Sequence, residues 1–137
     1  MEEFIWPIRV YYEDTDSAGV VYYANYLRFL ERARTEWLRT LGVEQDALAQ
    51  QERLIFAVRS LQLDYLKPAK FNDLLHVTVT ISKAGKASVT FDQAIRHAYG
   101  EQSLLCTGRV KVACISADTF QPHAIPEKIG REILSGC

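Results

Sequence analysis

Three carboxylates lie close together in one short segment, residues 13–26, which has the sequence EDTDSAGVVYYANY. Glu13, Asp14 and Asp16 come first, Gly19 follows, and three tyrosines close the segment. Clustered carboxylates can serve as general acids or bases, as nucleophiles, or as ligands of a cation. This segment is therefore the first candidate for a functional site.

Two other interpretations of the same carboxylates have to be weighed. Aspartates in such a place often only form Asx turns or cap a helix, and composition alone does not decide between that role and catalysis. Asp14, Asp16 and Gly19 also match positions one, three and six of a calcium-binding EF-hand loop. Position five is Ala18 and position twelve is Asn25, where a bidentate Glu is needed, so calcium is disfavoured.

A third interpretation is catalytic. The segment precedes a predicted helix, and the first N–H groups of a helix can hold a developing oxyanion. A carboxylate a few ångströms away could attack a carbonyl or activate a water. Thioesters suit this chemistry because their thiolate leaves without strong general-acid help.

The histidines support that interpretation by exclusion. His76 and His97 fall in or at the ends of predicted strands, and His123 falls in a loop between prolines. The sequence has no HExxH, no cluster of Cys and His, no GxSxG and no glycine-rich phosphate loop. We therefore expect no metal and no cofactor.

Hydrophobic periodicity predicts the elements that position the segment. Strands are expected over residues 4–13, 54–66, 74–82, 87–97 and 103–116, and helices over residues 24–41, 44–50 and 126–134. Pro7 places the first strand near an edge, Gly42 should end the long helix, and Gly85 should turn a hairpin.

This order of elements predicts an α+β fold in which one long helix covers an antiparallel sheet. Residues 1–137 are expected to form one domain, because the chain is too short for two of ordinary size. With one helix on the sheet, apolar sheet surface is left uncovered, so self-association is expected.

Arg34 is the one helix residue that conflicts with its surroundings. It falls among Leu27, Leu30 and Leu41, inside the apolar arc of the helix. A guanidinium in that place must be paired or lie at a subunit contact. We favour an ion pair with Glu31, or with an acid of residues 13–16, over a role in substrate binding.

Composition excludes several function classes. The formal net charge is −1, with 16 basic and 17 acidic residues, which gives no basic excess for nucleic-acid binding. The acidic N-terminus lacks the features of a signal peptide, and no apolar stretch could span a membrane, so a cytoplasmic location is expected. Three cysteines without CxxC spacing are expected to be reduced thiols, Cys106 and Cys114 among them.

The motifs DTDSAGVVYYANY and LRFLERARTEWL together resemble the signature of the 4-hydroxybenzoyl-CoA thioesterase family, within the hotdog superfamily. The stretches WPIRVYYEDTD and AVRSLQLDYLKPAKFNDLL and the strand order are also similar, so the resemblance covers nearly the whole chain. It is strongest to the branch of the Tol-Pal-associated acyl-CoA thioesterases. It implies a single hotdog domain, in which a five-stranded antiparallel sheet wraps a long central helix.

The resemblance also implies roles for particular residues. Asp16 takes the place of the catalytic carboxylate, as nucleophile or general base, and the backbone N–H of Tyr23 would polarise the thioester carbonyl. Asp14 would shape the turn or act on Asp16 through its like charge. Some relatives carry His where this chain has Tyr23, which leaves a role of that side chain undecided.

Acyl-CoA is the substrate that the resemblance implies, and its phosphates need cations. The candidates are Arg59 with Ser60 and, near the hairpin, Lys83 and Lys86, although for each one taken singly an ordinary solvated residue is the favoured interpretation. A homotetramer built from hotdog dimers is the implied assembly. Acyl length is left open, with short to medium aliphatic chains favoured.

Two other functions remain as alternatives. A hotdog dehydratase generally uses a histidine with a carboxylate, and no histidine precedes His76. A non-catalytic module could bind acyl chains or an acyl carrier protein, with Arg28, Arg32 and Arg39 facing an acidic partner.

Overall fold

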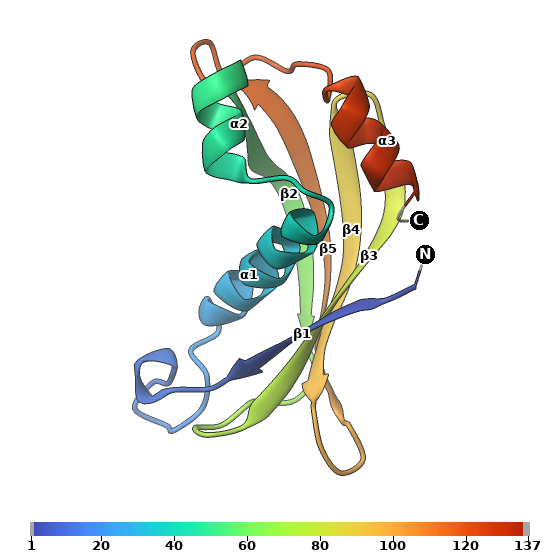
Figure 1. Cartoon of the computed structure of the whole chain (residues 1–137). Helices are drawn as coiled ribbons and strands as arrows, with labels where there is room; N and C mark the ends of the chain where they lie inside the picture. Colours follow the sequence, from blue (N-terminus) through green and yellow to red (C-terminus); the bar gives the residue numbers. More distant parts are fainter. Residues whose placement is uncertain (1, 136–137) are drawn as a thin grey trace.

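The computed structural model describes residues 2–135 and contains one five-stranded sheet with three α-helices (Figure 1). The strands are β1 (Phe4–Arg9), β2 (Leu54–Tyr65), β3 (Leu74–Ala84), β4 (Ser88–His97) and β5 (Leu104–Ser116), and the helices are α1 (Asn25–Thr40), α2 (Gln45–Glu52) and α3 (Glu127–Ser135). All pairings are antiparallel, in the order β1-β3-β4-β5-β2. The predicted α+β hotdog class is confirmed.

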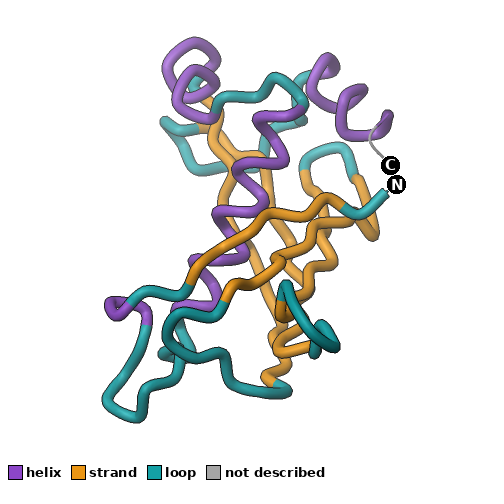
Figure 2. Tube along the Cα trace, turned by 60° about the horizontal axis from the view of Figure 1, so that its bottom comes forward, coloured by secondary structure: helices purple, strands orange, loops and turns teal. Residues whose placement is uncertain are grey.

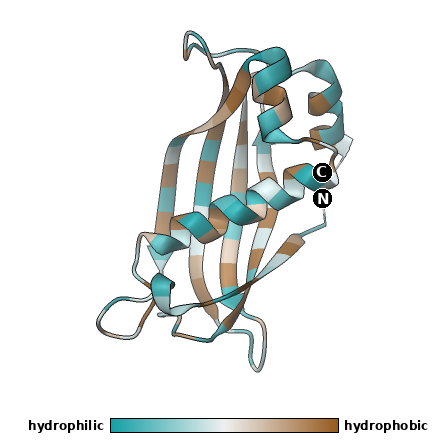
Figure 3. Cartoon of the chain, turned by 60° about the vertical axis from the view of Figure 1, so that its left-hand side comes forward, coloured by the Kyte–Doolittle hydropathy of each residue, from teal (hydrophilic) through white to brown (hydrophobic). Residues whose placement is uncertain are grey.

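Helix α1 lies across one face of the sheet and buries an apolar stripe there (Figure 3). Phe29, Leu30 and Ala33 are almost fully buried, and Trp37 packs its ring edge-on against Phe91 of β4. Phe29 and Ala33 were not among the residues expected on this face. Burial of these side chains, at about 25 cal/mol per Å² of apolar area, fixes the helix on the sheet.

The C-terminus of α1 is a Schellman motif. Val43 N–H donates to the Leu38 carbonyl at 3.0 Å, and Gly42 N–H donates to Arg39 at 2.9 Å. Gly42 has φ +82°, a conformation that glycine adopts without a Cβ penalty. The predicted helix end at Gly42 is confirmed.

The long strands alternate between an inner apolar face and an outer polar face, which Figure 3 shows as bands of colour. On β4, Val89, Phe91 and Ile95 point inward and are buried. Both Cys106 and Cys114 of β5 are buried free thiols, as predicted, and Cys137 lies outside the described residues. The inner faces and α1 together form the core.

The first strand is shorter than predicted. β1 ends at Arg9, and a 3₁₀ turn over Tyr12–Asp14 follows, because the Asp14 carboxylate binds the Tyr11 N–H at 2.8 Å and pulls the chain out of the sheet. Tyr12, which the predicted strand over residues 4–13 included, therefore lies outside the sheet and is 76% exposed. Since β1 pairs only with β3, the prediction that Pro7 marks an edge strand is confirmed.

The loop before α1 and the loop between β2 and β3 lie side by side at one end of the sheet (Figure 2). Val20 pairs with Lys70, and Val21 N–H donates to the Ala69 carbonyl at 2.8 Å. The second loop therefore braces the carboxylate-rich segment. None of the described helices is both long and apolar enough to cross a membrane.

Candidate active site

The carboxylate-rich segment closes into a tight turn ahead of α1. Tyr22 N–H donates to the Asp14 carbonyl at 2.9 Å, and Asp16 N–H donates to Val20 at 2.9 Å. Gly19 turns the chain with φ +80°, which favours glycine. Asp16 is thereby held at the exposed tip of the turn.

The two aspartates of this turn have different surroundings. Asp14 is only 7% exposed, and its Oδ2 accepts the Tyr11 N–H, so its carboxylate is used to build the turn. Asp16 is exposed, and its Oδ1 accepts the Ala18 N–H at 2.8 Å in an Asx turn. Within residues 2–135 the Asp16 Oδ2 makes no hydrogen bond or ion pair, which leaves this oxygen free to react.

The N-terminus of α1 carries no side-chain cap. Its N-cap residue is Ala24, and its first turn contains no acidic residue, so neither aspartate caps α1, although Asp16 forms the Asx turn and Asp14 closes the 3₁₀ turn. The backbone N–H groups of Tyr23 and Ala24 have no acceptor in the described part of the chain. Free N–H groups at the positive end of a helix dipole are suited to bind an oxyanion.

Tyr65, at the end of β2, holds the helix start from the side. Its hydroxyl donates to the Tyr23 carbonyl at 3.0 Å, and its ring lies 5.4 Å from that of Tyr26. The Tyr26 hydroxyl in turn accepts the Ala69 N–H at 3.0 Å. Sequence reasoning missed Tyr65, although it lies in the stretch before Pro68 that carries part of the family resemblance.

Three tyrosines around the turn, Tyr22, Tyr26 and Tyr65, have raised pKa values. A hydrogen bond with Tyr23 is the main cause that raises the pKa of Tyr22, and the negative charge of Asp16 adds to it. Burial raises the pKa of Tyr26 and of Tyr65.

The histidines take no part in the turn. His97 Nε2 lies 3.1 Å from Asp73 Oδ2, and the same oxygen accepts the Lys70 N–H at 2.9 Å. His97 thus supports the loop that pairs with Val20. Within residues 2–135 no histidine hydrogen-bonds to Asp16, so a Ser-His or Cys-His type of catalysis has no basis in this turn.

The predicted coenzyme A contacts do not gather around Asp16 within one chain. Arg59 and Ser60 are exposed near the middle of β2, where Arg59 lies in a bulge. Lys83 and Lys86 lie at the β3–β4 hairpin, and Lys83 is nine residues, about 30 Å, along β3 from Leu74 at the Asp16 end of the strand.

Arg34 is buried as predicted, but not in an ion pair. Its Nη1 donates to Gln93 Oε1 of β4 at 3.0 Å, while Glu31 only acts on it through its charge. The expected partner was wrong because sequence periodicity locates a residue on a helix face and not the strand that packs there. Burial lowers the pKa of Arg34.

These features define a hotdog-fold thioester hydrolase, with an exposed carboxylate next to an uncapped helix N-terminus. The chain belongs to the thioesterase-like superfamily, whose family model matches residues 10–133. Membership confirms the family that the sequence motifs indicated.

Two relatives are similar over nearly their whole length. The chain is 44% identical over 126 residues to the acyl-CoA thioesterase YbgC of Haemophilus influenzae, covering 92% of this chain and 90% of that protein. It is 43% identical over 129 residues to the acyl-CoA thioester hydrolase YbgC of Escherichia coli, covering 94% of each.

Solved structures of thioesterases share the fold. The 1,4-dihydroxy-2-naphthoyl-CoA thioesterase Slr0204 from Synechocystis superposes with a TM-score of 0.89 at 25% identity, over 97% of this chain and 96% of that one. A probable thioesterase from Bartonella henselae has a TM-score of 0.85 at 36% identity, over 91% of this chain and 100% of that one.

Proposed function

We propose that this enzyme hydrolyses acyl-CoA to a free acid and coenzyme A, with Asp16 as nucleophile or general base. The observation that carries the proposal is the uncapped start of α1, where the free Tyr23 N–H follows the turn that presents Asp16. The YbgC relatives, named for this activity, support the choice of substrate. The cytosol is the compartment that we propose.

The reaction follows from the two groups. The thioester oxygen accepts the Tyr23 N–H, which stabilises the negative charge that develops on it. The free Asp16 Oδ2 then attacks the carbonyl carbon, giving an acyl-aspartyl anhydride that water cleaves, or it takes a proton from a water that attacks. Either route expels the coenzyme A thiolate. Tyr65 keeps the Tyr23 peptide in place through its hydrogen bond.

The test is release of free thiol from a panel of acyl-CoAs that differ in chain length and aromaticity. Asp16→Asn should lower kcat by about 10²–10⁴ while the protein stays folded. Asp14→Asn is the matched control, because an amide oxygen can still accept the Tyr11 N–H, and it should stay within about threefold of wild type. Wild-type turnover by Asp16→Asn would refute the assignment.

A single turnover in H₂¹⁸O separates the two roles of Asp16. If Asp16 attacks, water can cleave the anhydride at either carbonyl, so heavy oxygen should appear in the Asp16 peptide by mass spectrometry. If Asp16 only activates water, all of the label should appear in the released acid.

We propose a second copy of the chain at the β2 edge, as part of the homotetramer built from dimers. β2 is an edge strand, and its inward side chains Val58, Leu61 and Tyr65 are 47%, 44% and 49% exposed. Unpaired edges with apolar side chains favour association. The partner's β2 would then carry Arg59 and Ser60 toward the first subunit as coenzyme A contacts.

Sedimentation velocity tests this assembly. Leu61→Asp should shift the protein to smaller species and reduce turnover, whereas Leu134→Asp, at an exposed site on α3, should change neither. An unchanged assembly in Leu61→Asp would contradict the proposed interface.

A non-catalytic module that binds an acyl carrier protein is the less favoured alternative. Of the three helix cations considered for it, Arg39 is paired with Glu36 and Glu44, and Arg32 lies over the ring of Phe29. Within residues 2–135 Arg28 and Arg32 form no ion pair, so of the three only Arg39 is already neutralised by carboxylates. Binding of an acyl carrier protein without hydrolysis of any acyl thioester would favour this alternative.

A further inference from the structure

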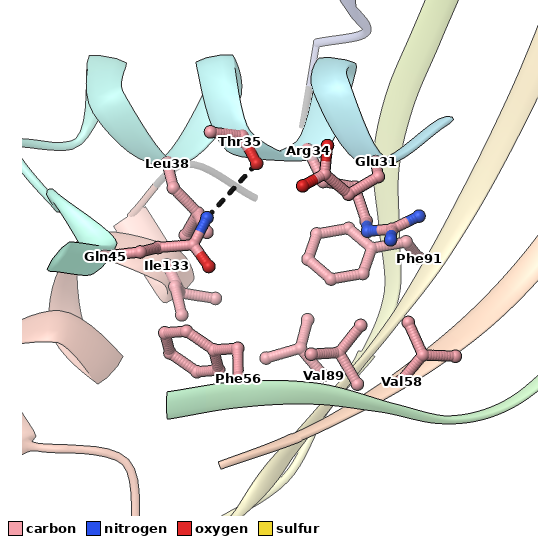
Figure 4. A pocket seen from close by; sticks show the side chains of 11 residues that line it. Glu31, Arg34, Thr35, Leu38, Gln45, Phe56, Val58, Val89, Phe91 and Ile133 are labelled. Atoms are coloured by element: carbon pink, nitrogen blue, oxygen red, sulfur yellow. Dashed lines mark hydrogen bonds between the residues drawn. The ribbon is translucent and has the colours of Figure 1, made fainter. Parts of the chain in front are cut away.

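A cavity of about 110 Å³ lies between α1 and strands β2, β4 and β5, apart from the Asp16 turn (Figure 4). The strands line it with apolar side chains, which are Phe56, Val58, Val89, Phe91 and Val112. Helix α1 lines the other side with Glu31, Arg34 and Thr35. The cavity is thus a mostly apolar space with a guanidinium in its wall.

Arg34 is an unusual group in such a wall, because only 8% of it is exposed. Its guanidinium extends from α1 beside the ring of Phe91 (Figure 4). One N–H donates to the neutral amide of Gln93 at 3.0 Å. Within residues 2–135 no carboxylate oxygen lies within 4.0 Å of it, so the guanidinium has no counter-ion there.

This arrangement leaves a buried charge without a counter-ion. A desolvated cation is costly unless an anion pairs with it, and a guanidinium pairs best with a carboxylate, through two parallel hydrogen bonds. Glu31 also lines the cavity, but its side chain is exposed and makes no ion pair with Arg34. Within residues 2–135, therefore, no carboxylate serves as the counter-ion of Arg34.

We propose that this cavity binds a small amphipathic carboxylate, with the carboxylate paired to Arg34 and the hydrocarbon tail against Phe56, Val89 and Phe91. A cavity of about 150 Å³ takes a benzene molecule, so about 110 Å³ suits a tail of about four carbons. A free carboxylic acid of this size belongs to the class of products that the proposed reaction releases. The site does not depend on Asp16, because no residue of that turn lines the cavity.

Isothermal titration calorimetry of the full chain with pentanoate tests the proposal, with pentanol as the uncharged control. Pentanoate should bind at one site per chain, at least tenfold more tightly than pentanol, because a charge-assisted pair is lost in the alcohol. Pentanoate binding should persist in Asp16→Asn, so a failure of this proposal can be distinguished from a failure of the proposed function. Equal affinity for pentanol, or no saturable binding of pentanoate, would overturn the proposal.

Variants locate the site. Arg34→Met keeps the length of the side chain and removes the charge, and it should weaken pentanoate binding by about tenfold to hundredfold. Arg34→Lys should retain part of the affinity, since it keeps the charge without the planar fork. Arg131→Met, on exposed α3, is the matched control and should bind as wild type does. Unchanged binding in Arg34→Met, with circular dichroism showing a folded protein, would place the carboxylate elsewhere and refute the assignment.

Discussion

Gln93 of β4 joins helix α1 to two strands, and its replacement by Met tests how much this network stabilises the fold. Its Oε1 accepts from Arg34 at 3.0 Å, while its Nε2 donates to the carbonyls of Leu30 at 3.1 Å and Thr78 at 3.3 Å. Gln93 is 4% exposed, so water cannot replace these bonds readily.

The expected loss can be worked from the bonds. Each neutral hydrogen bond contributes about 1 kcal/mol and the charge-assisted one about 1.5–3 kcal/mol, so Gln93→Met should lower the free energy of unfolding by roughly 3–5 kcal/mol. Arg34→Met should cost less, since it removes the desolvated charge and leaves only an amide oxygen without a partner. The double variant should then be more stable than the two single changes predict, with a coupling energy of about 2 kcal/mol.

Urea unfolding at one fixed protein concentration measures these values, because association would otherwise change the apparent stability. Fluorescence of Trp37 is a suitable signal, since this buried side chain packs against Phe91 at the same helix–sheet contact. A Gln93→Met variant within 1 kcal/mol of wild type would refute the reasoning. The reasoning would also be refuted if the double variant lost as much stability as the two single variants together, within about 0.5 kcal/mol.

Three further predictions follow from single residues. Gly108→Ala should destabilise the protein by roughly 1–3 kcal/mol in calorimetry, because the new Cβ would lie 2.8 Å from Leu63 and 3.1 Å from Leu30 in the core. A wild-type Tm would show that these side chains can move aside, and would contradict the prediction. Gly42→Ala should cost about 1–2 kcal/mol in urea unfolding, since φ is +82°, and an equally stable variant would contradict the strain. Burial raises the pKa of Cys106 to about 11, so this thiol should resist disulfide reagents at pH 8 in the native protein and react in urea. Stability should fall between about pH 9 and 11, where the unfolded thiol loses its proton first; rapid labelling of native Cys106 would contradict this assignment.

Local sequence patterns were enough for most of the fold. The helical period of residues 24–41 and the glycine that follows predict α1 and its end, because both depend on contacts within a few residues. The hairpin at Gly85 follows from turn chemistry in the same way. The first strand was predicted four residues too long, because the hydrogen bond from Tyr11 N–H to the Asp14 carboxylate competes locally with sheet pairing, and alternation of apolar residues does not reveal it.

The site was predictable only in part, because some of its residues are far apart in the sequence. The Asp16 turn is one continuous segment, so a motif can indicate it. Tyr65 reaches Tyr23 from a strand that begins after α2, and Gln93 reaches Arg34 across 59 positions. Such contacts depend on how strands pair, which periodicity does not specify.

Pro7 bears on how large an assembly of this chain can become. It lies within β1, the edge strand opposite β2, and has no N–H to offer to a further strand. If two copies join along β2, the two β1 strands become the outer edges of the combined sheet, each interrupted by a proline. Strand addition would then stop once two sheets have joined along β2. Although β2 exposes apolar side chains for pairing, the proline at each outer edge would protect the chain from growing into a fibre.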